Sequence, residues 1–554
     1  MTVEEKIRAV RRWMCENGVG ALVVPTDDPH GSEYPAEHWQ CRCWLTGFTG
    51  SAGDAVVTMD EALLWTDSRY WLQAEEQLAG TEFRLMRIGK DKEMEDWMEE
   101  HGCVNTDDNP RFVVRSCEEP FDSIWMDRPS LPLTKAWVMP DELSGESAAS
   151  KLGRLVRWLV EQGRESVLIS DLAEVAWMLN IRGSDIDYNP FVIAFLQVNA
   201  KGGHILYVND SQVDGIREYL SSIGVGIAPY DQVSCQSGCV CTTPVAVWKA
   251  SKNSVEQDGF RQAHVCDGVA MVRLLAWLDS VSSVTEIDVA EKLTALRAEH
   301  PGFMGLSFGT IVGYGAHGAI VHYEATPETD AVIRRKGLLL LDSGAHYFLR
   351  DRADCDGFAG TTDITRTIAM GVPSGEERRV YTLVLKGHLQ LQHAVFPVAT
   401  TGLQLDTFAR AAMWRAGYDF GHGTGHGVGH VLGVHEGPVQ IRGNCRADTV
   451  VPVCEGIVIT DEPGIYVEGK YGVRIENALL CVKAWETDFG SFLKFDPLTL
   501  CPYDRRLIEL DMLTDDEVCW IDEYHQRVRE LILPLLNDDT EREWLLWATE
   551  RYKK

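Results

Sequence analysis

The chain has 554 residues, of which 45% are hydrophobic and 24% charged, as in ordinary globular proteins. Its formal net charge of −31 at pH 7 argues against nucleic acid or an anionic membrane as a partner, because both attract basic surfaces. The length predicts three or four domains, each large enough for its own hydrophobic core.

The N-terminal residues continue as a charged amphipathic helix pattern and lack the apolar core of a signal peptide. No apolar run approaches the roughly eighteen residues of a membrane span. The 15 cysteines show no disulfide rhythm, and the clusters Cys41/Cys43 and Cys235/Cys239/Cys241 have no matched second pair at zinc-site spacing. We expect reduced thiols in a cytoplasmic protein.

Residues 1–140 alternate strand-like and helical segments, with strands expected at Ala21–Val24 and Ala55–Thr58. The proline-rich stretch 127–134 is a candidate linker. A second α/β unit is expected over residues 141–248, with a strand at 166–170 and a helix at 172–179. The sequence therefore predicts two α/β domains in its first half.

The sequence pattern changes near residue 249, and this change marks the start of a third domain, expected over residues 249–488. It starts with a capping-box pattern at Ser254–Gln257, before a helix that places several apolar side chains on one face. Those side chains are Phe260, Ala263, Ala270, Leu274, Trp277 and Leu278. Residues 489–554 form a C-terminal extension with helical patterns around 518–521 and 543–547.

The stretch 421–430, Gly-His-Gly-Thr-Gly-His-Gly-Val-Gly-His, has glycine at every second position. In an extended chain this spacing directs His422, His426 and His430 to one side, with glycine allowing close approach of backbone or ligand. A phosphate-binding loop is the weaker alternative, because no Gly-Lys-Ser/Thr follows. Imidazole is both a common metal ligand and an acid/base group.

Carboxylates lie in apolar, strand-like frames on both sides of this stretch. Asp342 ends the run Leu338–Leu341, Asp363 precedes Ile364, and Glu462 and Glu476 follow further apolar runs. One such acid alone is usually a salt-bridge or turn residue, but four around a histidine-rich loop point to a bound cation. Four carboxylates with one imidazole favour two Mn²⁺-like ions over a thiolate zinc site.

The order Asp, Asp, His, Glu, Glu resembles the pita-bread metallopeptidases: methionine aminopeptidase, prolidase and aminopeptidase P. The sequence motifs at 318–323, 422–429, 435–438 and 460–464 resemble those of the long, cytosolic type of Xaa-Pro aminopeptidase. So do Phe495–Leu500 and, upstream, the phrases at 45–53, 65–70 and 179–185. The resemblance therefore covers most of the chain.

The resemblance implies an α/β (α+β) fold with two creatinase-like α/β domains before a pita-bread catalytic domain. It implies that Asp342 binds one metal ion and that Asp363 and Glu476 bridge two. It implies that His426 and Glu462 complete the coordination of the second ion. Mn²⁺ is the expected metal, with Zn²⁺ and Co²⁺ as alternatives. A homodimer is expected.

The resemblance also assigns roles in catalysis and substrate binding. Glu462 acts as the general acid and base, while His322 and His435 lie beside the scissile carbonyl. Arg69, His322, His426 and His435 form the expected substrate-binding set. Arg474 is expected to orient the neighbouring Glu476.

The chain departs from the family between Asp342 and Asp363, where the segment around Phe348–Phe358 is longer than usual. We expect a longer, solvent-exposed hairpin there.

The implied activity is removal of the first residue from peptides with proline second. A prolidase, which cleaves only Xaa-Pro dipeptides, is the alternative within the same fold. The motif His435–Pro438 and the C-terminal extension argue against a prolidase. A catalytically dead binding scaffold is disfavoured, because all five ligand positions are filled.

Overall fold

A computed structural model describes residues 1–102, 120–233, 243–350, 357–443 and 450–553. The chain divides into two compact units, Met1–Leu133 and Thr134–Lys554. This division falls within the proline-rich stretch 127–134 that the sequence marks as a linker. The finer four-domain boundaries at 140, 248 and 488 stay predictions, since residues 134–554 form one unit.

The first unit is built on a four-stranded sheet of order β1-β2-β3-β4, antiparallel except for the parallel pair β3 and β4. Its first helix begins at a capping box between Thr2 and Glu5 and buries Ile7, Val10 and Met14. The elements are α1 (Val3–Asn17), β1 (Ala21–Val24), α2 (Cys41–Thr46), β2 (Asp54–Thr58), β3 (Ala62–Thr66), α3 (Trp71–Gln77), β4 (Arg84–Arg87), α4 (Met94–Glu100) and α5 (Phe121–Ile124).

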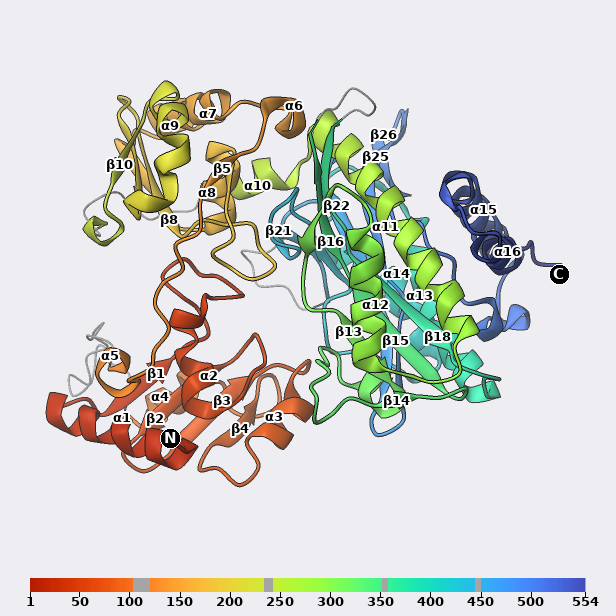
Figure 1. Ribbon diagram of the computed structural model, residues 1–554, viewed down its shortest axis with the longest axis horizontal. Coiled ribbons are helices and arrows are strands. Elements are labelled where there is room, and N and C mark those ends of the chain that lie inside the picture. Colours follow the sequence, from red (N-terminus) through yellow and green to blue (C-terminus); the bar gives the residue numbers. More distant parts are fainter. Residues whose placement is uncertain (103–119, 234–242, 351–356, 444–449, 554) are drawn as a thin grey trace. The chain divides into compact units, whose positions relative to one another are not determined.

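The second unit starts with the other α/β sheet, of order β10-β9-β8-β6 (Figure 1). The expected strand and helix at 166–179 are present as β6 and α8. The elements are β5 (Trp137–Val138), α6 (Asp141–Ser144), α7 (Ala148–Glu161), β6 (Ser166–Ile169), α8 (Leu172–Leu179), β7 (Ile181–Arg182), β8 (Ala194–Asn199), β9 (His204–Val208), α9 (Arg217–Ser222), β10 (Val225–Ala228) and α10 (Val245–Ala250).

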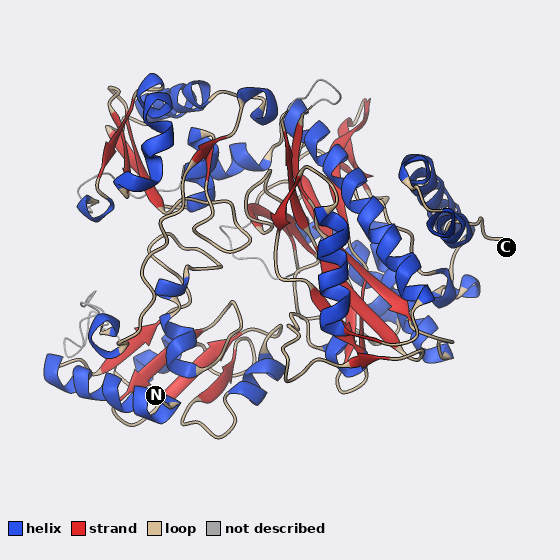
Figure 2. Ribbon diagram, in the orientation of Figure 1, coloured by secondary structure: helices blue, strands red, loops and turns tan. Residues whose placement is uncertain are grey.

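Antiparallel sheets flanked by long helices form the next part of this unit (Figure 2). β15 lies at the centre of the three-stranded sheet β13-β15-β18, and its Leu339 and Leu341 pack in one core with residues of α11 and α12. The helices and first strands are α11 (Ser254–Ser280), β11 (Val284–Thr285), α12 (Glu286–Ala298), β12 (Phe303–Leu306), β13 (Ile311–Tyr314), β14 (Val332–Ile333), β15 (Leu338–Ser343), β16 (Ala345–Leu349), β17 (Phe358–Thr361), β18 (Ile364–Ala369), α13 (Gly375–Gln392) and α14 (Gly402–Arg415).

A six-stranded sheet of order β19-β26-β25-β22-β20-β21 completes this part, and Leu405 and Ala409 of α14 pack in a core with its strands. The predicted boundary at 488 lies in the turn between β25 and β26. The strands are β19 (Val395–Pro397), β20 (Gly425–Gly427), β21 (Glu436–Ile441), β22 (Val458–Asp461), β23 (Gly464–Val467), β24 (Tyr471–Arg474), β25 (Asn477–Thr487) and β26 (Gly490–Pro497).

The C-terminal helices α15 (Asp515–Ile532) and α16 (Asp539–Ala548) coincide with the helical patterns expected there. Ile521 and Val528 of α15 are buried in the same core as Val384 of α13. The extension is therefore part of the fold of the second unit.

One local expectation, at the start of α11, is wrong. The box that starts α11 uses Asn253 and Glu256, one residue earlier than Ser254 and Gln257, because the Asn253 side chain accepts the first free N–H groups. The glycine-spaced stretch is a strand only at Gly425–Gly427.

Candidate active site

Asp342 lies near the end of β15, opposite Ile311 of β13 and Thr365 of β18. Because side chains alternate along a strand, it shares a face with Leu340 and points away from the leucines that pack on α11 and α12. One carboxylate oxygen accepts a hydrogen bond from Arg474 Nη2 at 2.6 Å. Within the described residues, no donor reaches the other oxygen, Oδ1, although it is buried.

Asp363 and Glu476 each lie directly before a strand, at the starts of β18 and β25. Both are buried. The backbone N–H of Glu476 donates to the Thr365 carbonyl at 3.1 Å. The Thr365 hydroxyl in turn donates to the Glu476 carboxylate at 2.8 Å. These two bonds hold Glu476 beside the strand that follows Asp363.

His426 lies in β20, and Glu462 directly follows the neighbouring strand β22. The His426 Nε2 atom lies 3.5 Å from Asp363 Oδ2 and 3.5 Å from Glu462 Oε1. Its Nδ1 atom lies 2.9 Å from the Gly427 carbonyl, which assigns the ring proton to Nδ1. The lone pair of Nε2 therefore faces the carboxylates.

The donor set fits a divalent cation. Ligand atoms of Asp363, His426 and Glu476 all lie within 4.8 Å of one another. Burial, and then the neighbouring carboxylates, raise the pKa of Asp363 and of Glu476 well above the usual carboxyl range. These raised pKa values and the unpartnered Asp342 oxygen show that the protein itself only partly compensates the negative charge of the ionised carboxylates.

Arg474 supplies the positive charge beside this cluster. It donates to Asp342, to the Tyr466 hydroxyl at 2.8 Å and to the Thr365 hydroxyl at 3.1 Å. The sequence places it next to Glu476, yet its direct partner is Asp342, and Thr365 links it to Glu476. Thr365 itself is absent from the predicted site. Its position two residues after Asp363, the spacing that places side chains on one side of an extended chain, is a signal for it in the sequence.

His435 and His322 are placed near the cluster by different contacts. The rings of His435 and His426 meet edge to face, with centroids 4.4 Å apart. His322 follows Val321, whose carbonyl accepts a hydrogen bond from Arg474 at 3.3 Å. The residue before His322 therefore contacts the guanidinium that pairs with Asp342.

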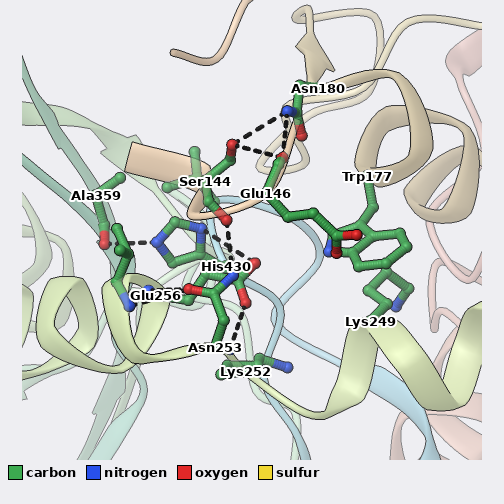
Figure 3. A network of polar contacts seen from close by, with 12 residues as sticks. Ser144, Glu146, Trp177, Asn180, Lys249, Lys252, Asn253, Glu256, Ala359 and His430 are labelled. Atoms are coloured by element: carbon green, nitrogen blue, oxygen red, sulfur yellow. Dashed lines mark hydrogen bonds and ion pairs between the residues drawn. The ribbon is translucent and has the colours of Figure 1, made fainter. Parts of the chain in front are cut away.

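The other two histidines of the glycine-rich stretch have different surroundings: His430 points into the core, and His422 contacts Tyr466, whose hydroxyl also accepts a hydrogen bond from Arg474. Figure 3 shows His430 directed at the Ala359 carbonyl, 2.8 Å from Nε2, and its Nδ1 lies 3.9 Å from Glu256. His422 bonds the Tyr466 hydroxyl at 2.8 Å. Burial lowers the pKa of His430 to about 3, so it is a neutral core residue.

Glu436, next to His435, was not singled out from the sequence. Its carboxylate forms buried ion pairs with Lys249, at 2.9 Å, and with Lys252. Lys249 lies in α10, and Lys252 lies in the short connection between α10 and α11 (Figure 3). They anchor the first residue of β21, directly after His435.

Arg69 belongs to the first unit, whereas the residues above belong to the second. Its guanidinium makes a bidentate pair with Asp67, at 2.8 and 2.7 Å, and lies 5.1 Å from the centre of the Tyr70 ring. Its predicted contact with substrate stays a prediction.

The segment between Asp342 and Asp363 is a hairpin, with β16 and β17 paired in register from His346↔Thr361 to Leu349↔Phe358. The acids at 351, 354 and 356 lie outside the described residues. The hairpin strands are mostly buried, and Leu349 and Phe358 pack in one core with Ala263 of α11. The expected exposed hairpin is therefore wrong for its strands, because α11 covers them.

A buried cluster of four carboxylates and one imidazole on antiparallel strands is the arrangement of a metal-dependent hydrolase. Residues 258–483 match the family described as Metallopeptidase family M24, and residues 491–552 match its C-terminal region. Residues 6–107 and 127–254 each match the Creatinase/Prolidase N-terminal domain. The predicted fold class, two such domains before the catalytic domain, is confirmed.

Curated relatives match over nearly the whole chain. Aminopeptidase P1 of Lotus japonicus is 35% identical and covers 99% of both chains. The Xaa-Pro aminopeptidase 1 of Dictyostelium discoideum is 34% identical and covers 100% of this chain and 97% of its own. The crystal structure of an X-prolyl aminopeptidase from Caenorhabditis elegans, described as a cytosolic enzyme with a di-nuclear active site, superposes with a TM-score of 0.92 at 32% identity, covering 100% of each chain.

The chain thus belongs to the Xaa-Pro aminopeptidase (aminopeptidase P) group of the M24 metallopeptidases. This confirms the family that the sequence motifs indicate. In the described part of the chain, no helix combines the length and apolarity needed to cross a bilayer.

Proposed function

We propose that this protein hydrolyses the bond between the first residue and a proline in second position, releasing that first residue. The observation that carries the proposal is the buried cluster around Asp363, His426 and Glu476, in a chain that matches Xaa-Pro aminopeptidases from end to end. The unpartnered oxygen of Asp342 supports a cation at the same place.

Two divalent ions are the proposed cofactors, with Mn²⁺ preferred and Zn²⁺ and Co²⁺ as alternatives. Asp342 would bind one ion, Asp363 and Glu476 both, and His426 and Glu462 the other. When bound, such a pair supplies a water molecule of lowered pKa and positive charge for the developing oxyanion. The hard oxygen donors with one nitrogen support Mn²⁺.

Glu462 is the proposed general acid and base. Its side chain is 19% exposed, against 5% for Asp363 and 11% for Asp342, so it is the most accessible of these three carboxylates. It would take a proton from the attacking water and return it to the proline nitrogen. His322 and His435 would donate hydrogen bonds to the scissile carbonyl, with His426 and Arg69 as further substrate contacts.

Proline in second position sets the substrate requirement. The bond to proline has no N–H, and the fixed φ of proline excludes the usual extended binding mode of peptidases. A site for such bonds needs a pocket for the ring and donors for the preceding carbonyl, here assigned to His322 and His435. The acidic cluster would anchor the free amino terminus.

A cytoplasmic location and a homodimer complete the proposal. The cytosolic relative from Caenorhabditis elegans supports the first. The net charge of −31 supports peptides, rather than nucleic acid or membranes, as partners. Light scattering on the purified protein measures the oligomeric state, and a mass twice that of the 61.9 kDa chain is expected.

A peptide panel tests the activity. Metal-loaded protein should cleave Xaa-Pro-Yaa after Xaa, while Xaa-Ala-Yaa should react far more slowly and the N-acetylated peptide should not react. Cleavage confined to the Xaa-Pro dipeptide would make the protein a prolidase. Equal rates on the proline and alanine peptides would make it a general aminopeptidase of this fold.

A further inference from the structure

Arg366 of β18 is buried, with 1% of its surface exposed, three residues after Asp363. No carboxylate of the described residues forms an ion pair with it; its guanidinium donates to neutral oxygen atoms. A buried charge is costly unless its hydrogen bonds are satisfied, so these acceptors fix the side chain in one geometry. They fall into two groups on two different parts of the chain.

The first group surrounds the proposed ligand Glu476. Arg366 Nη1 donates to the Glu476 carbonyl at 2.6 Å and to the Thr365 carbonyl at 2.9 Å. Nη2 donates to the Asn477 side-chain oxygen at 2.8 Å. Arg366 therefore holds the backbone from which the Glu476 carboxylate projects.

The second group belongs to the C-terminal extension. Nη2 also donates to the Cys501 carbonyl at 2.8 Å and to the Tyr524 hydroxyl at 3.0 Å. Nε donates to the Pro502 carbonyl at 3.3 Å, and the ring of Tyr503 lies 5.0 Å from the guanidinium carbon. The same guanidinium thus connects the extension to the segment that carries Glu476.

Tyr503 makes a second connection. Its hydroxyl accepts from the Asn477 amide at 3.2 Å and lies 2.8 Å from His388 Nε2. The other ring nitrogen of His388 lies 3.1 Å from Asp461 Oδ2. Asp461 directly precedes the proposed ligand Glu462, and Asn477 directly follows the proposed ligand Glu476. All members of this chain of contacts are buried.

We propose that the C-terminal extension is a positioning element of the metal centre, acting through Arg366, Tyr503 and Tyr524. The inference rests on the proposed function, because it takes Glu462 and Glu476 as metal ligands. Groups that hold metal ligands in place typically contribute 10–100-fold to affinity or activity. Without the hydroxyls of Tyr503 and Tyr524, the Glu476–Asn477 segment loses contacts that fix the direction of the Glu476 carboxylate.

The test removes only the two hydroxyls, with the double variant Tyr503→Phe/Tyr524→Phe, so that the packing of both rings is kept. Tyr552→Phe is the matched control: it lies in the same extension, and its buried hydroxyl has no hydrogen-bond partner among the described residues. Equilibrium dialysis with Mn²⁺ measures the dissociation constant of each site. The melting temperature of the metal-free proteins reports on the fold.

The double variant should bind at least one Mn²⁺ about 10–100-fold more weakly than the wild type, with Tyr552→Phe unchanged. Equal affinity in all three folded proteins would overturn the inference. If the metal-free double variant does not fold, Tyr524→Phe alone is measured, with the same two outcomes. If the wild type binds Zn²⁺ or Co²⁺ instead of Mn²⁺, the same comparison is made with that ion. A wild-type protein that binds none of the three would instead contradict the proposed function itself.

Discussion

Variants of Glu462, His322 and His435 should differ in how much they change the metal content of the protein. Glu462→Gln removes a ligand charge and the proton carrier, so activity should fall by at least the ~10²–10⁴-fold typical of general acid/base groups. His322→Ala and His435→Ala should lower kcat while metal content stays near that of the wild type. Elemental analysis of the purified variants decides this: a metal-free His435→Ala protein would make His435 a ligand.

The raised pKa values of Asp363 and Glu476 predict how the metal-free protein responds to pH. A folded-state pKa above the unfolded value means that the folded protein binds more protons in that window. The stability of the metal-free protein should therefore fall as pH rises from about 4, the ordinary carboxyl range, towards neutrality. Metal affinity should rise over the same range, because the ion displaces protons.

Urea unfolding at several pH values, with and without Mn²⁺, measures both trends. The metal-induced gain in stability should grow with pH. A gain that is constant between pH 5 and 8 would show that these carboxyl groups are already ionised in the metal-free protein.

The pairing of strands β20 and β22 sets the approach of His426 to Glu462, and Gly425 makes that pairing possible. A Cβ at Gly425 would lie 1.9 Å from the Thr460 carbonyl oxygen on the neighbouring strand. Gly425→Ala should therefore push the strands apart, costing about 1–3 kcal/mol or more in stability and most of the activity.

Gly423→Ala is the control, since its Cβ would lie 3.6 Å from the nearest atom, the Ile441 carbonyl oxygen. It should retain the melting temperature and kcat/KM of the wild type. An equal loss in both variants would show that chain stiffness, rather than the close contact at Gly425, is what matters.

The strands beside the carboxylates could be predicted from sequence, because each is an apolar or β-branched run with an acid at one of its ends. Asp342, Asp363 and Glu476 are where those runs place them. The course of the glycine-rich stretch could not be predicted. Val431 takes a positive φ of 49°, and His430 turns to the Ala359 carbonyl, a partner 71 residues away in sequence. The pairing of Arg474 with Asp342 likewise depends on tertiary contacts that local spacing does not encode.

At the scale of the whole molecule, resemblance and structure agree on the catalytic part and its extension. The sequence indicates the extension as an addition to the fold, but it does not indicate the contacts of the extension with Arg366. They depend on a buried arginine whose partners in the extension lie 135 to 158 residues further along the chain. For Arg69, in the separate first unit, the expectation still rests on the family motif alone.

The dinuclear centre is the central claim, and metal counting coupled to activity tests it most directly. Protein stripped by a chelator should be inactive on Xaa-Pro-Yaa peptides, and titration with Mn²⁺ should restore turnover, with two equivalents bound at saturation. Mn²⁺ should restore it better than Zn²⁺ or Co²⁺. Full activity after exhaustive removal of divalent metal would contradict the account.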